Sequence, residues 1–156
     1  MSRRAQITLT PAEQLELLES ERVVVVSSIG PRGWPHSMPM WFVLREGGEI
    51  RVWTYAKSQK VRNLERDPRA TLLVETGTEY VELRGVQIEA EAELIRDPET
   101  VFEFGKELTI RYAEGIDSVE GDAATALQAQ AAKRVVIHFE PVRVASWDHR
   151  KLGGTY

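Results

Sequence analysis

The chain has 156 residues, of which 42% are hydrophobic and 28% are charged, and its formal net charge is -4. These values are typical of a globular protein, and we expect residues 1–156 to form a single domain. The acidic balance argues against nucleic acid or an anionic membrane surface as the main partner. Because the chain contains no cysteine, disulfides, thiol nucleophiles and cysteine-ligated metal sites are excluded.

The sequence shows no targeting or membrane-spanning pattern. The first ten residues, MSRRAQITLT, contain arginines but no apolar stretch after them, so we read no secretory signal. Apolar runs such as VVVV at 23–26 are far too short to cross a bilayer. The default expectation is therefore a cytoplasmic protein.

The first half of the chain alternates helix and strand patterns. A Thr-Pro-Ala-Glu capping box predicts a helix over 10–20. A strand rich in β-branched residues is expected over 22–30 and another over 36–45. The turn EGG then joins the second of these strands to a strand over 49–55. A short helix over 58–66 follows, and Asp-Pro ends it.

The second half begins with a strand over 69–76 and a long strand over 80–95. A helix starts at an Asp-Pro-Glu signal and covers 98–115, because apolar residues recur there at helical spacing. A loop and a short alanine-rich helix over 123–132 come next. One more pair of strands is expected over 133–147.

Two residues are expected to interrupt these strands. Gly85 predicts a bulge or bend in the segment 80–95, and Pro141 predicts a break or bulge in 133–147. About six strands in hairpins, with a few peripheral helices, are typical of a mainly β (α+β) fold. We predict a small six-stranded antiparallel barrel with helical covers.

The helix over 58–66 has an unusual first turn. Ser58 stands at the N-cap, but Gln59 and Lys60 follow where the helix dipole favours acidic residues. From Lys57 to Arg69 there are five basic and two acidic residues, a local charge of +3 against -7 for the remainder. This pattern indicates a site for an anion such as phosphate. The alternative is a solvated helix with a charged outer face.

The strand over 36–45 is the second unusual segment. Trp34, Met38, Met40, Trp41 and Phe42 place much apolar bulk in GWPHSMPMWF, together with two prolines. Because the second proline, in the middle of the strand, cannot donate to a ladder, one flank of the strand is expected to be open or bulged. An open edge beside aromatic residues suits a flat heterocycle. A plain core strand is the alternative interpretation.

No residue pattern predicts a catalytic side chain or a metal site. His36, His138 and His149 lack the spacing of metal ligands, and no nucleophile motif, P-loop or dinucleotide-binding glycine pattern occurs. If the protein is an enzyme, a cofactor must supply the chemistry.

The strand HSMPMWFVLREGGEIRVWT followed by S-x-K-x-x-N-L-x-R-D-P-R resembles the pyridoxamine 5'-phosphate oxidase-like family, and more narrowly its flavin/deazaflavin oxidoreductases. The resemblance covers roughly residues 10–147. It implies a split β-barrel and a homodimer that binds a cofactor in each of two grooves at the interface. It also implies a small-molecule acceptor as the other partner.

The resemblance carries several cofactor-binding expectations onto this sequence. Ser58 and Lys60 match positions that bind the cofactor phosphate. Two other strand segments match positions that lie along the cofactor ring and its side chain. Tyr80 matches a residue that reaches the cofactor from the other subunit. The residues expected along the ring and its side chain are Met38, Pro39, Met40, Trp41, Trp53 and Thr54.

The match to the flavin mononucleotide (FMN) enzymes is incomplete. Those enzymes place an Arg-Lys pair at the phosphate and an arginine on the earlier strand, where this chain has Gln59-Lys60 and Met38. Relatives that use coenzyme F420, a deazaflavin with a long acidic tail, instead need a diffuse basic groove. The residues that could form it are Lys57, Lys60, Arg62 and Arg66.

The leading hypothesis is therefore an F420-dependent oxidoreductase that moves a hydride between reduced deazaflavin and a small conjugated acceptor. An FMN-dependent oxidase or reductase is the first alternative, and a non-catalytic cofactor or haem-binding protein is the second. The C-terminal segment ASWDHRKLGGTY leaves two further interpretations open. Trp147 and Tyr156 could cover a site, or Trp147 could simply complete the last strand.

Overall fold

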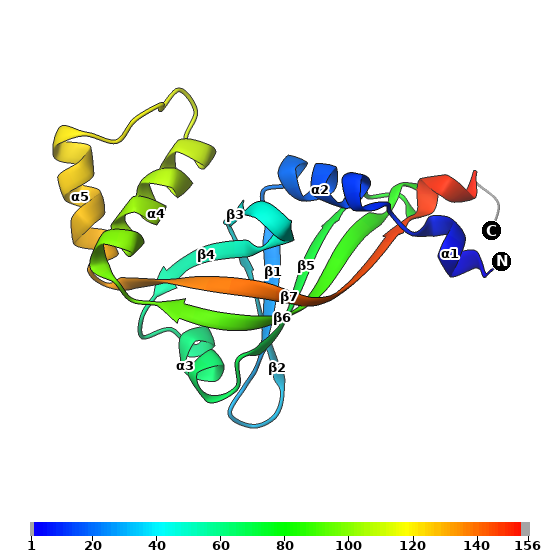
Figure 1. Cartoon of the computed structure of the whole chain (residues 1–156), viewed down its shortest axis with the longest axis horizontal. Helices are drawn as coiled ribbons and strands as arrows, with labels where there is room; N and C mark the ends of the chain where they lie inside the picture. Colours follow the sequence, from blue (N-terminus) through cyan, green and yellow to red (C-terminus); the bar gives the residue numbers. More distant parts are fainter. Residues whose placement is uncertain (1, 154–156) are drawn as a thin grey trace.

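Seven strands form one curled antiparallel sheet, a half-barrel, in a computed structural model that describes residues 2–153 (Figure 1). The strands are β1 Val24–Ile29, β2 Pro35–Met40, β3 Phe42–Leu44, β4 Ile50–Tyr55, β5 Arg69–Thr76, β6 Arg84–Ile95 and β7 Arg134–Asp148. The α+β barrel class predicted from the sequence is confirmed. The sheet has seven strands rather than six, because the expected strand over 36–45 is interrupted at Trp41.

The order of strands across the sheet is β2-β1-β5-β6-β7-β4-β3. The two edge strands, β2 and β3, follow one another in the chain with Trp41 between them. The sheet must therefore curl until its edges approach each other at Trp41, where they do not pair. Pro39 lies on the edge strand β2, opposite Val25 of β1. The flank of β2 that faces away from β1 is therefore open, as expected.

In the described part of the chain, five helices and three short 3-10 turns accompany the sheet. The helices are α1 Arg3–Ile7, α2 Pro11–Ser20, α3 Gln59–Arg66, α4 Pro98–Tyr112 and α5 Gly121–Ala131, and the 3-10 turns are η1 Glu46–Gly48, η2 Tyr80–Glu82 and η3 His149–Leu152. The helix α1 was not predicted. Helices α4 and α5 stand at one end of the molecule, and α1 and η3 lie at the other (Figure 1).

Local sequence explains where the helices begin. In α2 the Thr10 amide donates to Glu13 Oε2 at 2.6 Å and the Glu13 amide donates to Thr10 Oγ1 at 3.3 Å, which is the predicted capping box. In α4 the Thr100 amide donates to Asp97 Oδ2 at 2.9 Å, and Pro98 occupies the first turn.

The curled sheet encloses the main core, because residues of alternate strand positions point inward. Its largest fully buried side chains include Phe42, Leu72 and Phe139. A second, smaller cluster joins α4 and the end of α5 to the opposite face of β4 and β7. Its members are Val43, Val101, Phe104, Leu108, Ala131 and Val136, with Trp53 packed against them. This second cluster fixes the two helices against the barrel.

The two predicted interruptions have different outcomes. The register between β6 and β7 shifts at Glu89/Ala90, where Ala90 pairs with Pro141 and Glu89 with Arg143, so the bulge expected at Pro141 is confirmed. The segment expected as a pair of strands is nevertheless one strand, β7, because the bulge does not end the pairing with β6. Gly85 causes no register shift. A Cβ there would lie 2.4 Å from Trp147 Cζ2, and the glycine is needed because the indole covers it.

The first residues of the predicted strand 80–95 are not part of the sheet. Residues 80–82 form the 3-10 turn η2, and β6 begins at Arg84. Trp147 completes β7 over Gly85, whereas Tyr156 lies outside the described residues.

Candidate functional site

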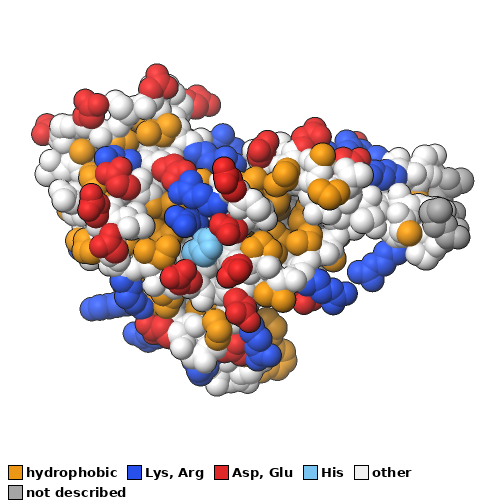
Figure 2. All heavy atoms as spheres, in the orientation of Figure 1, with side chains coloured by type: hydrophobic (Ala, Val, Ile, Leu, Met, Phe, Trp, Pro, Cys, Tyr) orange, Lys and Arg blue, Asp and Glu red, His pale blue; other side chains and the backbone are white. Residues whose placement is uncertain are grey.

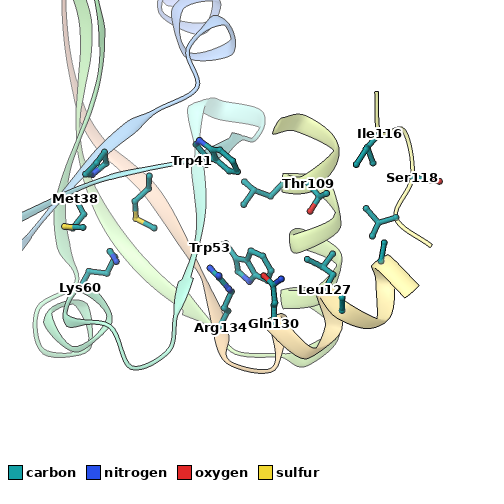
Figure 3. A pocket seen from close by; sticks show the side chains of 16 residues that line it. Met38, Trp41, Trp53, Lys60, Thr109, Ile116, Ser118, Leu127, Gln130 and Arg134 are labelled. Atoms are coloured by element: carbon teal, nitrogen blue, oxygen red, sulfur yellow. The ribbon is translucent and has the colours of Figure 1, made fainter. Parts of the chain in front are cut away.

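A groove with a volume of about 570 Å³ lies between the edge of the barrel and the helices α4 and α5 (Figure 3). Its size is in the range of small-molecule and cofactor sites. Its lining residues are Met38, Pro39, Met40, Trp41, Trp53, Lys60, Leu108, Thr109, Ile116, Ser118, Val119, Ala123, Ala126, Leu127, Gln130 and Arg134. Six of the residues expected from the sequence to bind a cofactor are therefore brought together in one groove.

The barrel wall of the groove is made by β2, Trp41 and β4. Met38, Pro39 and Met40 come from the open edge strand, which explains why one strand contributes three consecutive residues. Trp41, in the gap between β2 and β3, is 55% exposed and stacks on Tyr112 at a centroid distance of 4.5 Å. The Tyr112 hydroxyl in turn donates to the Phe42 carbonyl at 2.7 Å, so the end of α4 is tied to this gap.

Trp53 projects from β4 into the middle of the groove (Figure 3). A Cβ at Gly105 of α4 would lie 3.0 Å from the Trp53 ring, so the helix packs on the indole at close range because this residue is glycine. The Trp53 Nε1 atom is buried and has no hydrogen-bond partner among the described residues.

Lys60 is the cation on the barrel side of the groove. Its Nζ atom donates to Thr54 Oγ1 at 3.1 Å, and no carboxylate within residues 2–153 forms an ion pair with it. Burial lowers the pKa of the Lys60 ammonium below its ordinary value. Thr54, another expected cofactor residue, is itself buried and acts here by positioning Lys60.

The other residues expected around the phosphate lie next to the groove rather than in its lining. Ser58 is the N-cap residue of α3, but its Oγ makes no capping hydrogen bond and is buried without a partner among the residues described. Lys57 and Arg62 are exposed. Arg66 donates to the Ile29 carbonyl and so ties α3 to β1. Of the four expected bases, Lys60 is thus the one that lines the groove.

Tyr80 lies far from this groove within one chain. It is exposed in η2 and packs on His149 of η3 at 4.6 Å, near the end of the molecule opposite α4 and α5 (Figure 1). A role for Tyr80 toward the groove of another subunit stays a prediction.

Sequence reasoning missed the helical wall of the groove. Leu108 and Thr109 come from α4, Ile116 from the following loop, Leu127 and Gln130 from α5. The apolar periodicity of α4 was visible in the sequence, but it could not show which strand the helix covers.

Arg134 is the second cation of the groove and was also missed. It is the first residue of β7 and pairs with Tyr55 of β4. Its position next to Trp53 follows from this strand pairing, for which the sequence contains no local signal.

Within residues 2–153, the lining of the groove contains two cations and no acidic residue. The acidic side chains of α4, α5 and their connecting loop lie instead on the outer surface of these helices (Figure 2). Glu103, Glu107, Asp117 and Glu120 line a separate surface hollow there. A groove of aromatic and aliphatic side chains with unpaired cations suits a flat, anionic organic molecule.

The lining offers no side-chain pair for nucleophilic or acid–base catalysis. Thr109 donates to the Gly105 carbonyl at 2.9 Å within α4, and no histidine or carboxylate lines the groove. In the part of the chain that the structure describes, no three His, Asp or Glu side chains are grouped as metal ligands. Any reaction here therefore depends on chemistry that a bound molecule brings.

None of the helices within residues 2–153 is both long and apolar enough to cross a membrane.

The sequence of the chain matches a known protein family. A model of the family described as pyridoxamine 5'-phosphate oxidase matches residues 10–148. No curated protein sequence matches the chain.

Three solved structures illustrate the range of similar folds. The conserved hypothetical protein Rv2991 from Mycobacterium tuberculosis is 37% identical, with 100% of this chain and 95% of that chain covered and a TM-score of 0.87. A structure named F420 reductase is 24% identical, with 87% and 98% covered and a TM-score of 0.67. The haem storage protein HutZ from Vibrio cholerae is 16% identical, with 88% and 96% covered and a TM-score of 0.66.

Proposed function

The chain belongs to the pyridoxamine 5'-phosphate oxidase family, and from this premise we propose that it is an oxidoreductase that binds coenzyme F420. The bound coenzyme would exchange a hydride with a small conjugated acceptor. The similarity to a protein named F420 reductase supports this choice, although at 24% identity it shows only a shared fold.

One observation carries the proposal. The Lys60 ammonium reaches a groove that contains no carboxylate, and its pKa is lowered because burial penalises a charge without a counterion. A phosphate or carboxylate would supply the missing negative charge. Lys60 also stands in the first turn of α3, where the amides of the helix favour an anion.

The residues present fit a deazaflavin. Lys60 would hold an anionic group of the coenzyme, and Thr54 keeps the ammonium in place. Met38, Pro39 and Met40 would lie along the ring, beside the open backbone edge of β2. The buried Trp53 Nε1 and Ser58 Oγ, which have no partner in the described chain, are further polar atoms near the groove.

The coenzyme would supply the hydride chemistry, and the protein would supply binding, orientation and exclusion of water. The apolar lining serves the last of these tasks. Because no histidine or carboxylate of the described chain lines the groove, we expect that any proton needed by the acceptor comes from water or from the Lys60 ammonium.

The choice of F420 over FMN rests on the cations. Chains of the family that bind FMN have an Arg-Lys pair at the phosphate, whereas Gln59 precedes Lys60 here and is exposed. The missing arginine disfavours a localised clamp for the FMN phosphate. Of the bases expected to form a diffuse groove for F420, Lys60 lines the groove, and Lys57 and Arg62 are exposed near the same helix start. FMN and haem are the competing ligands in the test.

The proposal is tested by titrating the purified protein with F420, FMN and haem in parallel. We expect quenching of F420 fluorescence with saturation at low micromolar or lower concentration, and weaker effects of the other two. The variant Lys60→Ala should weaken F420 binding, and Lys106→Ala is the matched control. Lys106 lies on α4, pairs with Glu103 at 2.6 Å and is outside the groove.

Two results would overturn the proposal. Tight FMN or haem binding without F420 binding would assign the groove to a different ligand. F420 binding without hydride transfer to any conjugated acceptor would make the protein a coenzyme carrier rather than an enzyme.

A further inference from the structure

Arg134 has an unusual environment for an arginine. Its Cζ atom lies 4.4 Å from the ring centroid of Trp53 and 4.2 Å from that of Tyr55, so two aromatic rings contact one guanidinium. Its Nε atom is buried without a hydrogen-bond partner among the described residues. Cation–π contacts hold the group in place, but they do not satisfy its N–H donors.

No carboxylate within the described chain pairs with Arg134, in contrast with several other arginines. Arg45 pairs with Glu107, Arg96 with Glu65, and Arg150 with Asp148. Arg134 instead lines the groove. A fixed guanidinium in a groove without acids is suited to bind a carboxylate, because its fork of donors matches two oxygens and little side-chain freedom is lost on binding.

The surroundings of Arg134 differ from those of Lys60. In Figure 3 Lys60 lies beside Met38 on the α3 side, whereas Arg134 lies beside Trp53 and Gln130 on the α5 side. Leu127 of α5, which lies near Gln130 in Figure 3, and Leu108 of α4 contribute apolar side chains to the helical wall. The groove thus offers one cation beside the open strand edge and a second cation beside an apolar helical wall.

We propose that Arg134 binds the carboxylate of the hydride acceptor, so that the protein selects planar conjugated carboxylates whose apolar part packs on α4 and α5. That the carboxylate belongs to the hydride acceptor rests on the proposed function, but the binding of a carboxylate by Arg134 does not. Gln130, from the last turn of α5, lines the same part of the groove and can donate a second hydrogen bond.

The experiment measures binding rather than turnover. Isothermal titration with trans-cinnamate and with the neutral trans-cinnamamide is done on the full chain, with and without saturating F420. We expect that cinnamate binds at least about tenfold more tightly than the amide, as for a charge-assisted hydrogen bond. The variant Arg134→Met should remove this difference and leave the F420 affinity within about twofold.

Two further variants make the result specific. Arg134→Lys keeps the charge but not the fork, and should retain part of the preference for cinnamate. Arg96→Met removes an arginine outside the groove and should change nothing. Methionine is chosen because it preserves apolar contact with the two rings on which Arg134 packs. If Arg134→Met lowers the melting temperature, the preference for cinnamate is instead judged from Arg134→Lys.

Each alternative result separates this inference from the proposed function. If Arg134→Met weakens F420 and cinnamate equally, Arg134 belongs to the coenzyme site, and the inference is wrong. If wild type does not distinguish cinnamate from the amide, no carboxylate site exists there. If cinnamate binding depends on Arg134 but F420 does not bind, the inference holds for the site and the proposed function fails.

Discussion

Lys60 combines two features that oppose each other in the free protein. Its positive charge stands in the first turn of α3, where the helix dipole disfavours it, and burial lowers the pKa of its ammonium. Both penalties are relieved when an anion enters the groove. The residue therefore costs stability in the absence of ligand and stabilises the complex.

The first prediction follows directly. Lys60→Ala should weaken F420 binding about ten- to a hundredfold, as expected for loss of a charge-assisted contact of roughly 1.5–3 kcal/mol. The unliganded variant should be as stable as wild type or slightly more stable, by a few tenths of a kcal/mol. Fluorescence titration and thermal melting of the same samples measure both effects.

Lys60→Glu sharpens the contrast, since an acid suits the free helix start but repels an anionic ligand. Lys106→Ala is the control in both assays. Arg66 is unsuitable as a control, because its side chain donates to the Ile29 carbonyl and its loss would loosen α3. Equal affinity of wild type and Lys60→Glu for F420 would show that the lysine is only a solvated surface charge.

The second prediction concerns pH. An anion raises the lowered pKa of Lys60 again, so affinity is full below the pKa of the free protein and falls as the pH rises through it. The loss should begin at a lower pH than the titration of an ordinary lysine. The stability of the unliganded protein should rise over the same interval, because the buried charge disappears.

Lys60→Arg isolates the cause of the pH effect, because a guanidinium stays protonated. Titrations of F420 against both proteins from neutral to alkaline pH make the comparison. A parallel decline in the two proteins would assign the pH effect to the ligand or to another group.

At the scale of elements, Trp41, the residue between β2 and β3, connects the sheet to α4. Its half-exposed indole fills the gap between these strands, and its partner Tyr112 belongs to the last turn of α4. The Tyr112 hydroxyl also accepts from the Phe42 amide at 3.0 Å. The open edge of the barrel and the helical wall of the groove therefore meet at this aromatic pair.

The third prediction is that Trp41→Ala weakens ligand binding more than it weakens the fold. The lost stacking contributes about 0.5–1.5 kcal/mol, and a half-exposed ring adds little burial. Binding should fall by a larger factor, since the indole lines the groove. Trp34→Ala, at a 74% exposed turn residue outside the groove, is the control. Unfolding of Trp41→Ala would instead identify Trp41 as a core residue.

The fourth prediction concerns the pairing of β6 with β7. Gly85→Ala places a methyl group against the Trp147 indole and should cost about 1–3 kcal/mol of unfolding free energy through overpacking. Chemical denaturation measures this loss. The double variant Gly85→Ala/Trp147→Leu should be less destabilised than the sum of the single variants, because the clash is absent. Additive effects would mean that the two residues do not share a contact.

Features encoded by neighbouring residues could be read from the sequence, and features created by distant pairing could not. The capping box at Thr10 and the helix after Ser58 depend on a few adjacent residues, and both were predicted. The break at Trp41 depends on the curvature of the whole sheet. The place of Arg134 in the groove depends on the pairing of β4 with β7, and so it escaped prediction.

At the scale of the whole molecule, β7 exposes two apolar side chains. Val142 is 67% exposed and Val144 is 43% exposed, two positions apart on the strand. Exposed apolar side chains that lie near one another can form part of an interface, and these two valines offer such a patch. A symmetric pair would cover it from both sides.

The fifth prediction is therefore a homodimer in solution, in which Tyr80 of one subunit is expected to lie toward the groove of the other. Light scattering at micromolar concentration should give twice the 17.7 kDa mass of the chain. Val142→Glu should shift the mass toward the monomer, because two buried carboxylates would face each other across the axis. A wild-type mass of one chain would contradict the prediction.

The excursion from β6 to β7 has a consequence for how this protein can change. Ile95 and Val136 are paired neighbours in the sheet, so residues 96–133 leave the barrel and return to almost the same point. A segment with adjoining ends can be exchanged with little disturbance to the scaffold that holds it. The barrel wall with Lys60 and the helical wall with Leu127 then form separate modules. Replacing the helical module alone is thus a route by which one half of the groove can acquire new selectivity while the other half is inherited unchanged.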